Sequence, residues 1–174
     1  MRDEGEKQLG CVVTQRELIL HKAEWKRNRK RIVFAHGSFD LLHPGHIRLL
    51  EQARSLGEIL VVGVRSDAAV RAHHAREDQP ANAPSLHPLT SEAERAEIVA
   101  ALAAVDYAVV CDSPDPAEIL AQLQPDIVVE GAADPSVVPS PKNSAGTSPS
   151  AVFIPLEPGY SAARLIERIQ QLRA

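Results

Sequence analysis

Short apolar runs without polar alternation, separated by helical patterns, are the feature that most limits the fold of this 174-residue chain. Such runs are typical of strands that are buried on both faces of a sheet. We predict strands near residues 31–36, 59–64, 106–110, 126–130 and 152–154. Because helices are expected between them, the pattern predicts an α/β fold with a doubly wound parallel sheet in a single domain.

Two capping boxes mark helix starts, where a hydroxyl side chain and a glutamate three residues later satisfy backbone amides at the first turn. They are formed by Thr14 with Glu17 and by Ser91 with Glu94. A further helix is expected to begin at Pro116 after a cap at Asp115, since proline is favoured at the first helical position. The other predicted helices run from these caps to about residues 28 and 104, and over about 44–56, 68–73 and 161–172.

The ends of the chain and one internal segment differ in composition from the rest. Residues 1–13 are predicted to be a disordered N-terminal tail, because they are highly charged at the start and lack helical or strand periodicity. Residues 14–174 then form the domain. Within it, residues 132–150 are rich in Pro, Ser and Ala, so we expect a flexible loop there.

The charge balance excludes some partners. The chain has 19 Lys and Arg against 23 Asp and Glu, a net charge of −4. Such a chain has no general attraction for nucleic acid or for an anionic membrane surface. The basic cluster at residues 26–31 is interpreted as a solvated helix end, where cations suit the helix dipole. We therefore expect no nucleic-acid and no membrane partner.

The cellular compartment is predicted from the cysteines and from the lack of targeting segments. Cys11 and Cys111 have no metal-ligand spacing and are expected to be free thiols in a reducing cytosol. The charged N-terminus has no apolar core like that of a signal peptide, and no stretch is apolar enough to span a bilayer. We expect a cytoplasmic protein.

The segment from Gly37 to His46 carries the strongest chemical signal. It connects the first predicted strand to a helix that begins at Pro44, so the amides of residues 45–47 should point out of the helix start. These amides and the helix dipole attract phosphate oxygens. Gly37 and Gly45 allow a ligand to approach the backbone closely. The segment therefore predicts a phosphate-binding site at the carboxyl end of the strand, where ligands bind in such sheets.

His43 and His46 lie three residues apart across the helix start, so both imidazoles can donate hydrogen bonds to one phosphate group. In-line displacement at the α-phosphorus of a nucleotide suits this arrangement, because it needs positioning and charge stabilisation more than covalent catalysis. Two histidines alone supply half of a zinc site, so no protein-bound metal is expected.

The motifs Gly37-x-Phe39-Asp40 and His43-x-Gly45-His46 resemble the signature of the cytidylyltransferase-like nucleotidyltransferase superfamily. The chain is most similar to the D-glycero-β-D-manno-heptose 1-phosphate adenylyltransferase (ADP-heptose synthase) family, over about residues 13–173. This resemblance implies the Rossmann-like fold of HxGH nucleotidyltransferases. It also implies transfer of AMP from ATP to a sugar phosphate such as heptose 1-phosphate, with release of pyrophosphate.

The resemblance also implies roles for individual residues. His43 and His46 would be catalytic, together with Arg71, the nearest match to a phosphate-binding lysine of the family. Mg²⁺ would enter with ATP, the partners would be nucleotide and sugar-phosphate substrates, and a homodimer is expected because relatives commonly dimerise. The residues expected to bind nucleotide are Gly37, Ser38, Phe39, Asp40, Gly45, Arg95, Gly131 and Ser161.

Several positions depart from the family pattern, which leaves alternatives open. The family has asparagine where this chain has His36, Lys-Gly-Gly-Asp where it has residues 130–133, and Ser-Thr-Thr where it has residues 161–163. Loss of these polar groups is compatible with a degenerate paralogue that binds a nucleotide or a partner without turnover. A glycerol-3-phosphate type of cytidylyltransferase is the other alternative, since no residue identifies the base.

Overall fold

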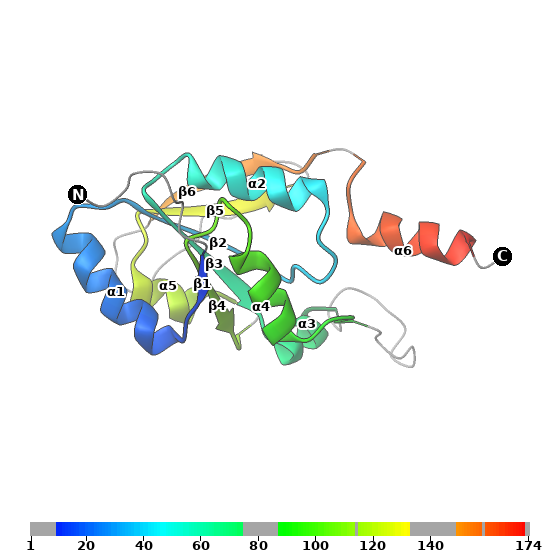
Figure 1. Cartoon of the computed structure of the whole chain (residues 1–174), viewed down its shortest axis with the longest axis horizontal. Coiled ribbons are helices and arrows are strands. Elements are labelled where there is room, and N and C mark those ends of the chain that lie inside the picture. The colour runs from blue at the N-terminus through cyan, green and yellow to red at the C-terminus, as the bar shows by residue number, and fades with distance from the viewer. Residues whose placement is uncertain (1–9, 75–86, 114, 133–148, 158, 173–174) are drawn as a thin grey trace.

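A computed structural model describes residues 10–74, 87–113, 115–132, 149–157 and 159–172. Its centre is one parallel six-stranded sheet with strand order β1-β4-β3-β2-β5-β6 (Figure 1). The elements in chain order are β1 Cys11–Val12, α1 Gln15–Arg27, β2 Ile32–Gly37, α2 Pro44–Arg54, β3 Ile59–Arg65, α3 Asp67–His74, α4 Glu92–Ala100, β4 Tyr107–Cys111, α5 Ala117–Leu123, β5 Ile127–Ala132, β6 Ser150–Pro155 and α6 Ala162–Gln171.

Both faces of the sheet are covered, which explains the unbroken apolar runs. On one face, α2 and α4 pack Leu50 and Val99 against strand residues such as Val33. On the other face, α1 and α5 pack Leu18 and Leu120 in a second buried cluster. The prediction of a doubly wound parallel α/β fold is confirmed.

Most boundaries agree with the sequence, and both predicted capping boxes form, at the starts of α1 and α4. The predicted tail was wrong at Cys11 and Val12, which form β1 and pair with Tyr107 and Ala108 at the edge of the sheet. Residues 1–9 lie outside the described residues. So do residues 133–148, which make up most of the predicted flexible loop; the end residues of that loop belong to β5 and β6.

Two helices are shorter than predicted. The helix α2 ends at Arg54 with Ser55 as its C-cap, and α4 ends at Ala100. The apolar periodicity continues beyond both ends because Leu56 and Leu102 still pack against the core from the following turns. Because the residues of these turns are apolar as well, the sequence pattern predicted both helices to be longer than they are.

The strand order places a switch point between β2 and β5. The chain proceeds outward from β2 through β3 to β4, whereas β5 and β6 lie on the opposite side of β2. Ligands bind at such a point, beyond the carboxyl ends of the strands. The helix α2 begins at this end of β2, and α6 extends away from the sheet (Figure 1). None of the helices in the described ranges is long and apolar enough to cross a membrane.

Candidate active site

Phe39 and Gly37 determine the shape of the turn after β2. Phe39 is buried and has a φ of +50°, a left-handed conformation that a bulky residue rarely adopts. Its ring covers Gly37, where a Cβ atom would stand 3.1 Å from the ring. The centroids of the Phe39 and His46 rings are 5.4 Å apart, in an edge-to-face arrangement. Backbone strain of this kind is often retained at functional sites.

His43 and His46 lie against each other at the start of α2. His43 is the N-cap, Pro44 is the first helical residue, and the two imidazole centroids are 3.8 Å apart with planes at 19°. The Nδ1 atoms of both rings are buried, and neither has a hydrogen-bond partner in another residue of the described chain. Buried polar atoms are normally hydrogen-bonded. The described chain therefore leaves these two ring nitrogens without the hydrogen bonds that buried nitrogens normally make.

Burial controls the charge of these side chains. It lowers the pKa of His43, and burial together with the neighbouring His43 lowers the pKa of His46 to about 4. His36, at the end of β2, also has a pKa of about 4, because it is buried and lies near Arg65. All three imidazoles are therefore mainly neutral at pH 7, and a neutral imidazole still donates one hydrogen bond.

The backbone at the helix start offers fewer donors than the sequence predicted. The amides of His46 and Ile47 donate to the carbonyl of His43, at 2.9 Å and 3.4 Å. The expectation of three free amides was therefore wrong for two of them, because the first turn closes on the N-cap carbonyl. The amide of Gly45 remains, beside the imidazole ring of His43.

A cleft of about 560 Å³ opens beside His43 and extends along α6. Ser161 lines it and caps α6, since its hydroxyl accepts a hydrogen bond from the amide of Arg164 at 3.2 Å. The exposed side chains of Arg164 and Arg168 are also on its wall. Glu167 also lines the cleft, so its wall carries His43, two arginines and one carboxylate. The excess of cationic side chains allows the cleft to hold an anionic ligand.

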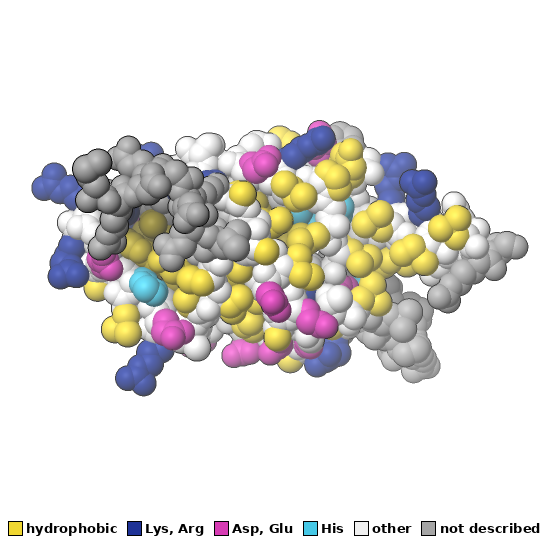
Figure 2. All heavy atoms as spheres, in the orientation of Figure 1, with side chains coloured by type: hydrophobic (Ala, Val, Ile, Leu, Met, Phe, Trp, Pro, Cys, Tyr) yellow, Lys and Arg dark blue, Asp and Glu magenta, His cyan; other side chains and the backbone are white. Residues whose placement is uncertain are grey.

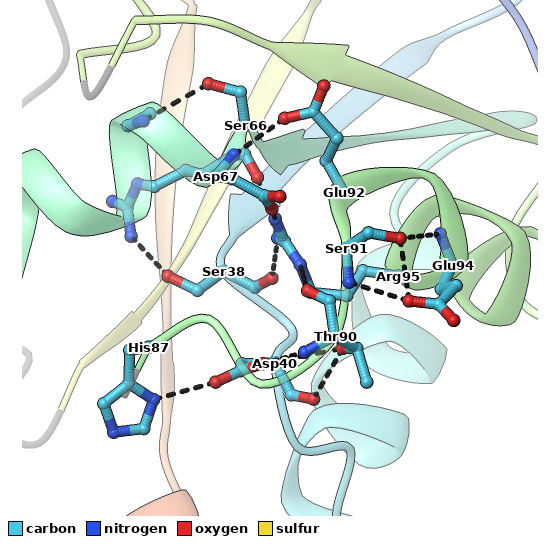
Figure 3. A network of polar contacts seen from close by, with 12 residues as sticks. Ser38, Asp40, Ser66, Asp67, His87, Thr90, Ser91, Glu92, Glu94 and Arg95 are labelled. Carbon is cyan, nitrogen blue, oxygen red and sulfur yellow. Dashed lines mark hydrogen bonds and ion pairs between the residues drawn. The ribbon is translucent and has the colours of Figure 1, made fainter. Parts of the chain in front are cut away.

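Arg95, predicted to bind nucleotide, makes its contacts within the protein. Its side chain is fully buried in a polar network at the carboxyl ends of β2 and β3 (Figure 3). It donates to the carbonyls of Thr90, Ser38 and Arg65 at 2.6–3.0 Å and forms an ion pair with Asp67 at 2.6 Å. The structure thus gives Arg95 a positioning role, because its guanidinium holds the turn at Ser38 rather than facing the cleft.

Asp40 belongs to the same region and holds the segment before α4. Its carboxylate contacts His87 Nδ1 at 2.8 Å and accepts hydrogen bonds from the amides of Leu89 and Thr90 (Figure 3). Burial alone would raise the pKa of Asp40, but these hydrogen bonds outweigh it and the pKa is lowered. The carboxylate is therefore ionised and already engaged within the protein.

Two predicted site residues are not brought to the histidine pair. Gly131 lies on β5, where a Cβ atom would stand 2.7 Å from side-chain atoms of Leu49 and Leu156. Glycine at that position is therefore explained by packing. Arg71 has an exposed side chain on α3 and does not line the cleft. In the described part of the chain, no three His, Cys, Asp or Glu side chains gather where they could hold a metal ion.

Sequence reasoning did not assign Tyr160 to the site. Tyr160 lines the cleft, with its ring centroid 6.4 Å from that of His43. An aromatic residue directly before a helix-capping serine is a signal for a residue that lines a binding site. Nothing in the local sequence connects this residue to the histidine turn. The contact depends on how β6 and α2 lie in space.

The histidine turn agrees with comparisons to known proteins. The profile of the cytidylyltransferase-like family matches residues 34–137. The chain is 40% identical over 159 residues to the bifunctional protein HldE of Koribacter versatilis, covering 90% of this chain and 31% of that protein. It is 41% identical over 156 residues to the same-named protein of Syntrophotalea carbinolica, covering 88% of this chain and 30% of that protein. The chain thus spans about a third of the length of these relatives.

Solved structures show the same fold. A lipopolysaccharide core biosynthesis protein from Thermoplasma volcanium is 24% identical, with a TM-score of 0.50 over 82% of this chain and 88% of that one. Pantoate-beta-alanine ligase from Francisella tularensis is 11% identical, with a TM-score of 0.54 over 95% of this chain and 80% of that one. The motif, the sheet and the profile match agree: the chain belongs to the cytidylyltransferase-like family.

Proposed function

We propose that this chain transfers AMP from ATP to a sugar phosphate such as heptose 1-phosphate and releases pyrophosphate. The observation that carries this proposal is the stacked pair of His43 and His46, whose buried Nδ1 atoms lack partners in the described chain. His43 also lines the cleft. The choice of AMP and heptose rests on the resemblance to the ADP-heptose synthase family, which the 40% identity to HldE proteins supports.

The reaction would be an in-line displacement. An oxygen of the acceptor phosphate forms a bond to the α-phosphorus of ATP, and the bond from that phosphorus to the bridging β-phosphate oxygen breaks. Pyrophosphate leaves with the electron pair. Negative charge then develops on the α-phosphate and on the leaving group, where donors fixed in advance are most effective. His43 and His46 would supply these donors, and the start of α6 at Ser161 would face the outer phosphates.

Mg²⁺ belongs to the substrate in this proposal. Asp40, the carboxylate nearest in sequence to the histidine turn, is engaged by His87 and by backbone amides. The ion would therefore be held by the triphosphate of MgATP rather than by a protein cage, as is common for Mg²⁺ at phosphate sites.

A second candidate is nucleotide binding without turnover. It is favoured by the internal bonding of Arg95 and by Ala162 following Ser161, since both reduce the number of donors available to phosphates. Calorimetry with ATP would show binding in either case. Pyrophosphate release separates the two candidates.

The test is pyrophosphate release with ATP or CTP and a panel of acceptors that includes heptose 1-phosphate, other sugar 1-phosphates and glycerol 3-phosphate. We expect release with ATP and a sugar 1-phosphate, and a loss of about 100-fold or more in turnover for His46→Ala. His21→Ala, on α1 against Trp25, is the matched control and should retain turnover. Full turnover by a folded His46→Ala protein would reject the assigned role. Preference for CTP and glycerol 3-phosphate would instead favour a cytidylyltransferase.

A further inference from the structure

One arginine of α2 connects the histidine turn to the segment that leads into α6. Arg48 Nη1 forms an ion pair with Glu157 Oε2, and the Arg48 guanidinium lies 5.5 Å from the centroid of the Tyr160 ring. Glu157 follows the end of β6, and Tyr160 immediately precedes the cap of α6. Arg48 therefore reaches across from one helix start to the other.

Tyr160 in turn lies directly against the histidine turn. Its ring plane is at 23° to that of His43. A Cβ atom on Gly45 would stand 3.0 Å from His43 Nδ1 and 3.3 Å from Tyr160 Cβ, so no side chain fits between them. Because Ser161 is the next residue, a contact that fixes Tyr160 also fixes where α6 begins.

The segment also has an apolar contact, because Leu156 lies with Leu49 of α2 against Gly131. Its own polar contacts are local: the amide of Tyr160 donates to the carbonyl of Glu157, and Arg164 donates to the carbonyl of Gly159. Within the described ranges, Arg48 is the charged residue from outside this segment that contacts it. The helix beyond it extends away from the sheet (Figure 1) and has ten residues, a length that is marginal for a helix without packing.

We propose that Arg48 is a positioning residue that holds Tyr160 and the start of α6 beside His43, through Glu157, and thereby sets the width of the phosphate cleft. The inference rests on the proposed function, since it assigns the cleft to the nucleotide phosphates. Arg48 and Glu157 are 48% and 38% exposed, and exposed ion pairs contribute little to stability. Displacing a reacting group by about 1 Å is costly for turnover. The contact therefore acts on catalysis far more than on folding.

The test compares Arg48→Ala, Arg48→Lys and Glu157→Gln with Lys26→Ala. Lys26 is the matched control because it forms an ion pair of similar exposure, at 2.9 Å from Asp126, which directly precedes β5 and does not line the cleft. Turnover should fall about tenfold or more for Arg48→Ala and Glu157→Gln. Arg48→Lys should fall less, because lysine keeps the charge but not the planar group over the ring. Lys26→Ala should keep full turnover, and the unfolding midpoints of all four variants should stay close together.

A second readout does not need activity. Burial lowers the pKa of His43 in the intact protein. Release of Tyr160 would expose the ring, so the pKa of His43, followed by NMR, should rise toward its ordinary value in Arg48→Ala but not in Lys26→Ala. If the unaltered chain releases no pyrophosphate, the proposed reaction fails and this titration still tests the contact. A His43 titration in Arg48→Ala that matches the unaltered protein overturns the proposal, as does turnover within twofold of the unaltered enzyme.

Discussion

At the residue scale, the conformation of the candidate site is costly for the free protein, and a bound ligand would stabilise it. Phe39 adopts a left-handed backbone, and the imidazoles of His43 and His46 are stacked with buried nitrogens that lack partners in the described chain. Each of these features costs folding free energy. A phosphate group that accepts hydrogen bonds from the imidazoles would recover part of that cost. The free protein therefore stays ready for the ligand at the expense of stability.

The buried histidines predict how stability depends on pH. His36 and His46 have a pKa of about 4 in the fold, against 6.5 for an ordinary histidine. As the pH falls from about 6.5 toward 4, the unfolded chain binds protons that the folded chain does not, so the free energy of unfolding must decrease over this window. Above about 6.5 both states are neutral and this contribution is constant. Urea unfolding at a series of pH values measures the slope.

Carboxylates also titrate in this pH range and contribute to the slope. The double variant His36→Asn/His46→Gln separates the contribution of the two histidines from that of the carboxylates. Its free energy of unfolding should decrease less steeply between pH 6.5 and 4 than that of the unaltered protein. Parallel curves for the two proteins would show that these histidines are protonated as easily in the fold as in the unfolded chain.

At the scale of elements, Arg95 joins four parts of the chain. From α4 it holds the turn after β2, the end of β3, the start of α3 and the segment before α4. Arg95→Met keeps the volume but leaves buried carbonyls without donors, so we expect a loss of about 3–5 kcal/mol in the free energy of unfolding. Lys22→Met is the control, since it removes two hydrogen bonds at the surface and should cost about 1 kcal/mol or less. Comparable losses in the two variants would contradict the positioning role of Arg95.

The same residue shows where sequence reasoning ended. Apolar runs and capping boxes depend on neighbours in sequence, and they predicted the parallel sheet and the start of α4 correctly. The partners of Arg95 come from three separate stretches of sequence, at Ser38, at Arg65 and Asp67, and at Thr90, so its burial had no local signal. The strand β1 has two residues and was missed for the same reason, because only its pairing with β4 reveals it.

The histidine turn was recognisable because its residues are consecutive and its chemistry is local. The stacking of His43 on His46 follows from their spacing at the start of α2. The other wall of the cleft, at Tyr160 and Ser161, depends on how β6 delivers the chain to α6. That relation is set by packing, which a single sequence does not display.

At the scale of the whole molecule, burial is unevenly distributed, whereas charge is mixed over the visible face. On the face drawn in Figure 2, cationic and acidic side chains are interspersed with apolar ones, which agrees with the nearly balanced composition. The central strands β2 and β3 are buried almost throughout, whereas most described side chains of α6 are exposed. The site therefore lies between a mostly buried central strand, β2, and a mostly exposed helix, α6.

This distribution predicts which backbone amides are protected from hydrogen exchange. Amides of β2 and β3 should exchange most slowly, through opening of the whole domain, because their hydrogen bonds lie between two covered faces. Amides of α6 should exchange fastest among the helices, because the helix is short and exposed. Hydrogen exchange followed by mass spectrometry, with and without a non-hydrolysable ATP analogue, measures both. The analogue should slow exchange at the start of α6 if phosphates bind between it and His43, while β2 stays unchanged. An α6 as protected as β2 in the free protein would mean that the helix packs on a surface other than the one seen here, and the cleft beside His43 would then have a different shape.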